Sequence, residues 1–455
     1  MNMKTHFLVF ASMLIILCSC DHFLDIKPDQ SIAIPENLSD VRAILDQQSE
    51  INDNFPGLMD LAGDDYFVDF TTWQSKPVDD QMLYIWDGSA TTEDPLTWNE
   101  SYGAILIANV ALESLDILES DGEDRSAINE LRGEAYFIRA IRLYHLSQLF
   151  CRPYASGTAN DGPGLPLRES SDLNATSFRV TVEQTYQYIL ENLSKAISFL
   201  PKKSASITRP GLDAAYGLQA KVYLSMQNYE KALTAAEQSL KIHPDLLDYN
   251  ELDPSPSIPF TLNNKELIYY AHNVSAGRLI TQTLANVDTL LYDLFEEDDL
   301  RKKLFFEPKN NGYMAFRGQY SANQRNLFAG LATDEVYLIK AECEARLDKT
   351  NECLTTLNTL LEKRWEKGKF QGIQSDSSER LLSMVLSERR KQLMFRGIRW
   401  GDLRRLNQET RFETVIRRRF PNIGEEYLLP PRDLRYTFLI PMKVIEFSGM
   451  EQNPR

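Results

Sequence analysis

The sequence predicts a mostly α-helical protein, a tetratricopeptide-like scaffold of helical hairpins with long loop-rich insertions. Residues 211–244 form a pattern of two short helices folded back on each other, with Asn228 at the turn and Pro244 ending the second helix. Residues 334–364 align with this stretch without a gap. Both stretches fit the period of about 34 residues that is typical of tetratricopeptide units.

Small side chains recur where two helices of such a hairpin must approach closely. Ala220 and Tyr223 share one face of the first helix, while Ala232, Ala236 and Ser239 follow the i, i+4, i+7 spacing on the second. In the second unit, Ala341 matches Ala220, Cys353 matches Ala232, and Leu357 matches Ala236. Because one unit cannot bury its apolar face alone, we expect the hairpins to stack. The alternative is a pair of unrelated amphipathic hairpins.

The first nineteen residues fit a lipoprotein signal peptide. Lys4 is followed by an apolar run, 7–17, which is too short to span a membrane. The ending Leu17-Cys18-Ser19-Cys20 matches a bacterial lipobox, so we expect Cys20 to be acylated and to become the first mature residue. Cys18 is a poorer acceptor because bulky Leu17 precedes it. The alternative is an ordinary secretory signal with an incidental cysteine.

The remaining chain, 20–455, is expected to be one interleaved domain with insertions at about 50–95 and 245–333. Pro254 and its neighbours Pro256 and Pro259 exclude regular structure there. Apolar spacing predicts the following further elements: helices at 38–47, around 98–112, at 131–150, 181–200 and 287–295, and a short strand at 266–271.

Charge and cysteine content exclude several classes of protein. The formal net charge is −16, and loss of Lys4 with the signal peptide makes it −17. Such a surface repels phosphate, so nucleic acid is not an expected partner. Five cysteines are too few for a disulfide framework. A bridge between Cys343 and Cys353 is an alternative, although the matching positions in the first hairpin, Val222 and Ala232, need none.

The sequence contains none of the common catalytic or metal-binding motifs. GxSxG, HExxH and GxxxxGK[ST] do not occur, and the histidines are scattered singly. We expect the acidic pair Asp64-Asp65 and the acidic run 296–299 to lie in solvated loops or at helix ends. The alternatives are glycosidase carboxylates, which need a separation of about 5–10 Å, and calcium at Asp64 or Asp65. We therefore expect no catalysis, no metal and no cofactor.

A basic series from Arg389 to Arg405 follows the second hairpin. Helical spacing turns Leu386, Leu393 and Phe395 inward and leaves arginines beside them. The series is consistent with an anion site. We favour ion pairs within the scaffold, with glutamates of the hairpins as partners.

Four stretches together resemble the SusD/RagB family of outer-membrane nutrient-binding lipoproteins. These are the lipobox with its continuation CDHFLDIKP; LRGEAYFIRAIRLYHLSQLF with PGLPL; the two hairpins; and SERRKQLMFRGIRWGDLRR with the terminal YTFLIP and QNPR. The resemblance implies a lipid-anchored protein on the outer face of the outer membrane. It also implies a SusC-type TonB-dependent transporter as partner, and a glycan, or in some members a peptide, as ligand.

Aromatic residues of the two insertions are the candidate ligand contacts. The apolar face of a sugar can lie on an aromatic ring while its hydroxyls reach polar side chains. The candidates are Tyr66 and Trp73 in the first insertion and Tyr313, Phe316 and Tyr320 in the second. The alternative for each is packing beneath a long loop. Rival functions are a surface glycosidase and a purely structural adaptor.

Overall fold

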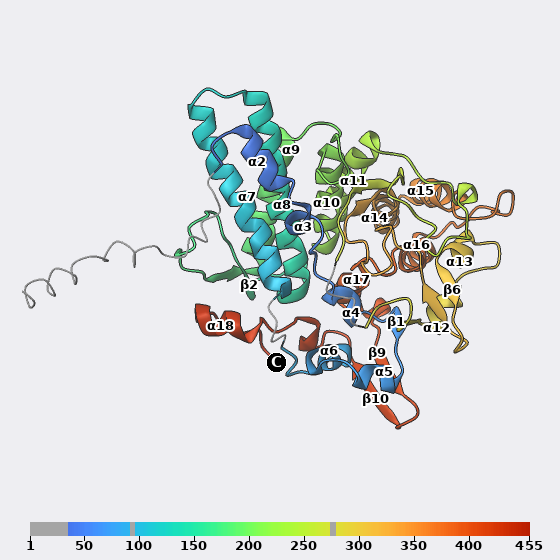
Figure 1. The fold of residues 1–455 in the computed structure, drawn as a ribbon. Coiled ribbons are helices and arrows are strands. Elements are labelled where there is room, and N and C mark those ends of the chain that lie inside the picture. The colour runs from blue at the N-terminus through green and yellow to red at the C-terminus, as the bar shows by residue number, and fades with distance from the viewer. Residues whose placement is uncertain (1–34, 92–95, 274–278) are drawn as a thin grey trace, which may run out of the picture.

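The computed structural model describes residues 35–91, 96–273 and 279–455. The predicted signal peptide, 1–19, and the predicted acylation site, Cys20, lie outside the described residues. Long helices occupy the upper part of Figure 1, and short helices and two-stranded hairpins lie along its lower part and right side. This arrangement confirms the mostly α-helical, hairpin-based prediction.

The N-terminal half is built around two long antiparallel helices, α7 (Leu96–Ser120) and α8 (Arg125–Phe150). α9 (Val182–Phe199) packs on α8, and α2 (Leu38–Leu45) packs on both long helices. Side chains cap the N-termini of α8 and α9. The Asp124 carboxylate accepts from backbone N–H groups in the first turn of α8, and Thr181 forms a reciprocal capping box with Gln184 at the start of α9.

The two predicted hairpins are present and packed together. The first consists of α10 (Leu212–Ser225) and α11 (Tyr229–Ile242), and the second of α14 (Thr333–Arg346) and α15 (Thr350–Glu362). Gly217 lies at this contact, where a Cβ atom would be at an ordinary van der Waals distance, 3.5 Å, from Val336 Cγ2. The Lys221 ammonium lies 3.1 Å from the Glu335 carboxylate across the same contact. The predicted stack is therefore confirmed.

The basic series forms two helices, α16 (Ser378–Gln392) and α17 (Arg399–Leu406). The expectation of unbroken helical spacing is wrong between them, because Phe395 and Gly397 have φ of 55° and 67° and reverse the chain. Leu393 and Phe395 are nevertheless buried.

The insertions and the C-terminal region consist of short elements. The first insertion holds α3 (Gln48–Ile51), α4 (Leu58–Ala62), β1 (Tyr66–Phe67), α5 (Phe70–Gln74) and α6 (Val78–Tyr84). The second holds η1 (Tyr249–Glu251), β4 (Leu267–Tyr269), β5 (Asn286–Val287), α12 (Thr289–Tyr292), α13 (Leu300–Leu304), β6 (Phe306–Pro308), β7 (Met314–Phe316) and β8 (Leu331–Ala332). The remaining short elements are β2 (Pro163–Pro166), β3 (Arg179–Thr181), η3 (Thr410–Phe412), β9 (Ile416–Phe420), β10 (Glu425–Leu429), η4 (Leu434–Tyr436) and α18 (Met442–Ser448).

Strand pairing joins the two insertions to each other. β1 pairs antiparallel with β5, with Tyr66 opposite Val287. The helix predicted at 287–295 is therefore wrong at both ends. Val287 is in the strand, and α12 ends at Tyr292; Asp288 caps it by accepting from the Leu291 N–H. The predicted strand at 266–271 is confirmed as β4, which pairs with β8. In the described part of the chain every sheet is a two-stranded antiparallel ribbon.

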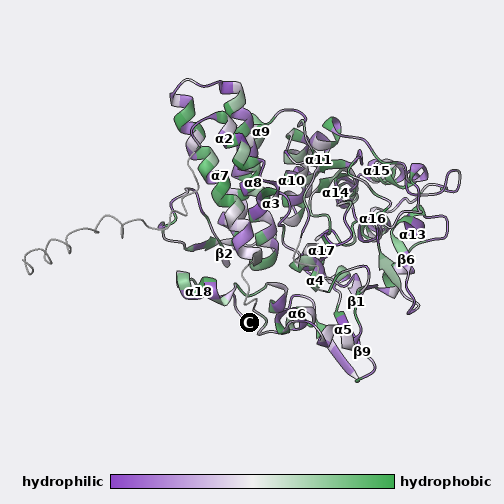
Figure 2. Ribbon diagram, viewed as in Figure 1, coloured by the Kyte–Doolittle hydropathy of each residue, from purple (hydrophilic) through white to green (hydrophobic). Residues whose placement is uncertain are grey.

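One large hydrophobic cluster runs from Phe55 in the first insertion to Met450 near the C-terminus. A second lies between α2, α7 and α8, and a third around the second hairpin. Figure 2 shows hydrophobic residues along much of α7 and α8. Within the described ranges one helix, 97–120, is long and apolar enough to cross a membrane, but 67% of its apolar window is buried in the protein. Cys343 and Cys353 are buried free thiols, so the alternative bridge is not formed.

Candidate functional site

The two insertions meet in a continuous cluster of aromatic rings. The centroid of the Trp73 ring lies 4.9 Å from that of Phe420. The Phe420 centroid lies 6.2 Å from that of Tyr84, which in turn lies 5.8 Å from that of Tyr66. The series continues at 6.2 Å from Tyr66 to Phe395. Phe316 stacks on Phe395 at 4.7 Å, so the cluster joins candidate residues of both insertions.

Two of the five candidate residues lie in the interior of this cluster. Tyr66 is 1% exposed, and its hydroxyl donates to the carbonyl of Leu61 at 2.9 Å. Tyr320 is fully buried, and its hydroxyl donates to the Glu266 carboxylate at 2.5 Å. Burial raises the pKa of both tyrosines well above the usual value. In this conformation neither ring offers a surface to a ligand, which agrees with the alternative of packing beneath a loop.

The other three candidates reach the surface. Tyr313 is 41% exposed and rests edge-on against Phe67, with ring centroids 4.9 Å apart. Phe316 and Trp73 are half-buried. The indole Nε1–H of Trp73 donates to the Gln81 carbonyl at 3.0 Å, so this side chain can offer a ligand its ring but not its N–H.

A small hollow lies beside Phe316 and Phe395. Its volume is about 20 Å³, and Gln282, Gln319 and Gln324 contribute amide groups to its lining. The Gln319 side-chain nitrogen donates to the Asn323 carbonyl at 2.7 Å, while its oxygen is buried with no partner among the described residues. The hollow has room for about one water molecule, so a single hydroxyl of a ligand lying against the Phe316 ring is the group that could reach this oxygen.

The turn carrying Tyr313 is fixed by a lysine. Lys309 Nζ donates to Asn286 Oδ1 at 2.8 Å and to the Ala285 carbonyl at 3.0 Å. Burial lowers the pKa of Lys309. Gly312, with φ of 83°, lets the hairpin between β6 and β7 turn tightly. The exposed Tyr313 ring is therefore presented from an anchored hairpin.

The basic series is paired inside the scaffold. Arg389 contacts Asp402 at 2.8 Å, Arg396 contacts Asp334 at 2.9 Å, and Arg405 contacts Glu342. These partners belong largely to the second hairpin, so the prediction of scaffold ion pairs is confirmed. Although burial opposes it, the neighbouring Arg405 and Arg346 lower the pKa of Glu342 to about 2.

The pair Asp64-Asp65 is not in a solvated loop, which corrects the expectation from sequence. Asp64 pairs with Arg399 at 2.6 Å and with Arg390 at 3.2 Å, and Asp65 is 4% exposed. Against the effect of burial, Arg399 and Arg390 hold the pKa of Asp64 well below its usual value, whereas burial raises the pKa of Asp65 to about 6. The pair fastens the first insertion to α16 and α17. No cluster of three or more metal-ligating side chains occurs among the described residues.

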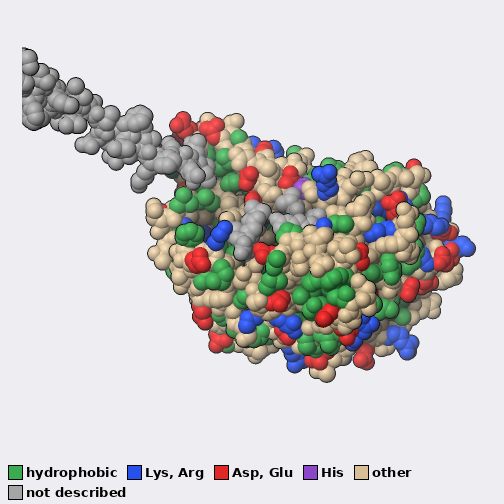
Figure 3. Space-filling view, turned by 60° about the horizontal axis from the view of Figure 1, so that its bottom comes forward, with side chains coloured by type: hydrophobic (Ala, Val, Ile, Leu, Met, Phe, Trp, Pro, Cys, Tyr) green, Lys and Arg blue, Asp and Glu red, His purple; other side chains and the backbone are tan. Residues whose placement is uncertain are grey.

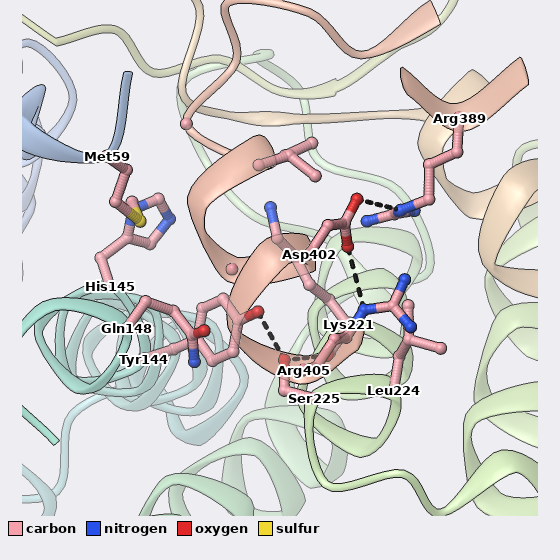
Figure 4. A pocket seen from close by; sticks show the side chains of 13 residues that line it. Met59, Tyr144, His145, Gln148, Lys221, Leu224, Ser225, Arg389, Asp402 and Arg405 are labelled. Atoms are coloured by element: carbon pink, nitrogen blue, oxygen red, sulfur yellow. Dashed lines mark hydrogen bonds and ion pairs between the residues drawn. The ribbon is translucent and has the colours of Figure 1, made fainter. Parts of the chain in front are cut away.

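An internal cavity of about 20 Å³ lies where α8, α10, α16 and α17 meet. Figure 4 shows Asp402 between Arg389 and Arg405, with Tyr144 bonded to Ser225 on the opposite side. Arg389 Nη1 and His145 Nδ1 are buried there without a partner in the described part of the protein. The volume suits about one water molecule, so this cavity is too small for a nutrient ligand.

The face carrying α5, α6 and the β9–β10 hairpin has mixed charge. In Figure 3, Lys and Arg side chains alternate with Asp and Glu, and hydrophobic side chains lie between them. Such a surface suits a neutral ligand better than a polyanion.

Sequence reasoning missed three residues of this region: Phe67, Gln319 and Phe395. Phe67 follows the buried Tyr66, but its ring contacts a different candidate, Tyr313, because β1 pairs with β5 and β5 lies against β7. Phe395 was assigned to the scaffold, and its contact with Phe316 depends on the left-handed turn after α16. The signal that could have found that turn is Gly397.

Comparisons with known proteins match most of the chain. A family profile described as "Starch-binding associating with outer membrane" matches residues 22–224, and the SusD family profile matches residues 333–429. The chain is 23% identical over 369 residues to SusD-like protein P2 of Formosa agariphila, covering 68% of this chain and 71% of that protein.

Solved structures share the fold. A SusD superfamily protein from Bacteroides thetaiotaomicron has a TM-score of 0.74 at 22% identity and covers 92% of this chain and 100% of its own. A putative sugar binding protein from Bacteroides vulgatus has a TM-score of 0.74 at 21% identity, covering 92% and 99%. With both profiles, the curated relative and the stacked hairpins in agreement, the chain belongs to the SusD/RagB family.

Proposed function

We propose that this protein is a surface lipoprotein that captures a glycan and passes it, without chemical change, to a SusC-type TonB-dependent transporter in the outer membrane. Acylated Cys20 would hold it on the exterior face, and residues 20–455 would act as one unit. The description of the matching profile, with its starch-binding and outer-membrane terms, supports this assignment.

The observation that carries the proposal is the presentation of aromatic rings by the joined insertions. Tyr313 is 41% exposed on an anchored hairpin, and the Phe316 ring lies beside the buried, unpaired oxygen of Gln319. Trp73 offers a ring whose N–H is already bonded. We infer that these three rings contact the sugar faces of the ligand, while Tyr66 and Tyr320 support them from beneath.

Tethering makes modest affinity sufficient. A ligand held on an anchored protein next to a transporter is at high effective concentration there, so it is rebound rather than lost by diffusion. Preformed rings on a packed scaffold also lower the entropic cost of binding.

Affinity electrophoresis against a panel of neutral polysaccharides tests the proposal. We expect retardation in at least one gel and weaker retardation for Trp73→Ala. Hydrolysis of the retarding polysaccharide by the purified protein would favour a glycosidase instead. Binding only to a peptide array would favour the peptide-binding alternative of the family. Binding to neither, with co-purification of a transporter, would favour a structural adaptor.

A further inference from the structure

A second, larger hollow lies at the other end of the molecule. It is a groove of about 840 Å³ between α7, residues 166–177 and α18. Its walls are mostly apolar and include Tyr102 and Leu106 on α7 and Phe447 on α18. Phe447 is 92% exposed and Leu173, on the opposite wall, is 68% exposed. An exposed apolar surface of this kind marks a contact site.

α7 itself indicates that this groove is normally covered. Ala104, Ala108 and Ala111 face α2 and α8, in a cluster that does not include Tyr102 or Leu106. The helix is apolar enough over 97–120 to resemble a membrane span. A helix that is apolar on every side is normally buried on every side.

A buried acceptor belongs to the lining of the same groove. The Asn109 side-chain nitrogen donates to the carbonyls of Arg168 and Ser170, at 3.2 and 3.0 Å. Its oxygen is buried and has no partner among the described residues, although Asn109 is only 1% exposed and lines the groove. An extended peptide, which carries backbone N–H donors and apolar side chains, satisfies both this oxygen and the walls.

We propose that the N-terminal segment of this chain, with Phe23, Leu24 and Ile26, docks in the α7–α18 groove. The described chain begins at Pro35, just before α2. The segment 20–34 therefore leads into α2, which packs on α7, the helix that forms one wall of the groove. Asp25 lies between these apolar residues and is opposite in charge to the exposed Lys443 on the other wall.

The geometry allows this docking. Arg42 of α2 contacts Glu130 and Glu134, and Arg132, between those two glutamates, contacts Asp116 on α7. Arg42 therefore lies near the level of Asp116, and the start of α2, four residues earlier, lies within about 6 Å of that level. Leu106 is ten positions further back on α7, which is about 15 Å at 1.5 Å per residue. The nine residues from Ile26 to Pro35 span about 30 Å when extended.

Docking would orient the protein on the membrane. Cys20 precedes Phe23 by three residues, so an acyl chain on Cys20 would lie within about 11 Å of the groove. The α7–α18 face would then lie against the membrane, away from the aromatic rings of the insertions. This consequence rests on the proposed acylation of Cys20, whereas the docking itself does not.

Disulfide trapping tests the docking in unacylated protein comprising residues 21–455. We expect Phe23→Cys with Phe447→Cys to cross-link within one chain at least tenfold faster than Phe23→Cys with Phe178→Cys. Phe178 is a matched control because it is 69% exposed near the groove but does not line it. Equal rates for the two pairs would overturn the proposal. A cross-linked dimer would also overturn it and would indicate a second copy as the occupant.

A second measurement needs no engineered cysteine. Leu106→Asp, checked for an unchanged helical circular dichroism spectrum, should release the segment and speed chymotryptic cleavage after Phe23 about tenfold. An unchanged cleavage rate would contradict the proposal. Polysaccharide retardation of the same protein reports on the aromatic site alone, so the two proposals can fail independently.

Discussion

Asp60 on α4 accepts a hydrogen bond from the backbone N–H of Gly397 at 2.7 Å. Its second oxygen accepts from the Asn273 amide at 3.1 Å. One buried carboxylate therefore ties the first insertion to the left-handed turn after α16 and to the second insertion. Burial raises its pKa to about 7.

This raised pKa predicts a pH dependence of stability. Between the unfolded pKa of 3.8 and the folded pKa of about 7, the folded state binds more protons at Asp60 than the unfolded state does. Stability from this group is therefore lost as pH rises through 7. The expected loss between pH 6 and pH 8 is about 1.4 kcal/mol. Urea unfolding at several pH values measures it.

Asp60→Asn is the control for this prediction. Its amide oxygen can still accept from Gly397, but it cannot ionise. The difference in unfolding free energy between the variant and the wild type should therefore change with pH by that amount. Parallel pH profiles would show that Asp60 titrates elsewhere.

The contact between the hairpins depends on a buried ion pair. Lys221 Nζ lies 3.1 Å from Glu335, and both side chains are largely buried. Lys221→Met or Glu335→Leu alone should lower the unfolding free energy by about 3–5 kcal/mol, because one buried charge loses its partner. The double variant Lys221→Met, Glu335→Leu should recover most of that loss. Chemical unfolding of all four proteins gives the coupling energy, and additive losses would contradict it.

Arg418 on β9 binds backbone carbonyls of the first insertion. Its guanidinium donates to the carbonyls of Tyr66 and Gly63 and lies 4.2 Å from the centre of the Tyr84 ring. Arg418→Met should cost about 3 kcal/mol or more, because several buried carbonyls lose their donor. Arg417→Met is the matched control, since its side chain is half exposed and its contact with Glu426 is 3.6 Å. Equal melting temperatures for the two variants would contradict the assignment.

The stacked hairpins could be predicted from sequence because their determinants are local. Ala220, Ala232 and Ala236 recur at helical spacing within one hairpin, and Asn228 and Pro244 mark its ends. The turn at Phe395 and Gly397 was missed because the apolar spacing continues across it. The Gly397 N–H at this turn donates to Asp60, a contact between residues 337 positions apart that the local pattern does not reveal.

The candidate site could be predicted only in part, because its geometry depends on contacts between distant segments. Composition identified both aromatic insertions. It could not show that Tyr313 is exposed whereas Tyr66 is buried, because Tyr66 lies in β1, which pairs with the distant strand β5. Likewise, Asp64 appeared to be a loop residue because its partner Arg399 is more than three hundred positions away.

The exposed ring of Tyr313 gives the sharpest test of ligand contact. Because Tyr313 is 41% exposed, Tyr313→Ala should change the unfolding free energy by less than about 1 kcal/mol. If the ring stacks on a sugar, binding should weaken by about 0.5–1.5 kcal/mol, or roughly two- to tenfold in dissociation constant. Phe178→Ala is the control, as an exposed aromatic beside the α7–α18 groove, and should leave retardation unchanged. Equal effects of both substitutions would remove Tyr313 from the site.

Gln319→Met then tests the hollow beside Phe316, where loss of the unpaired oxygen should weaken the binding of hydroxyl-rich ligands but not that of apolar peptides.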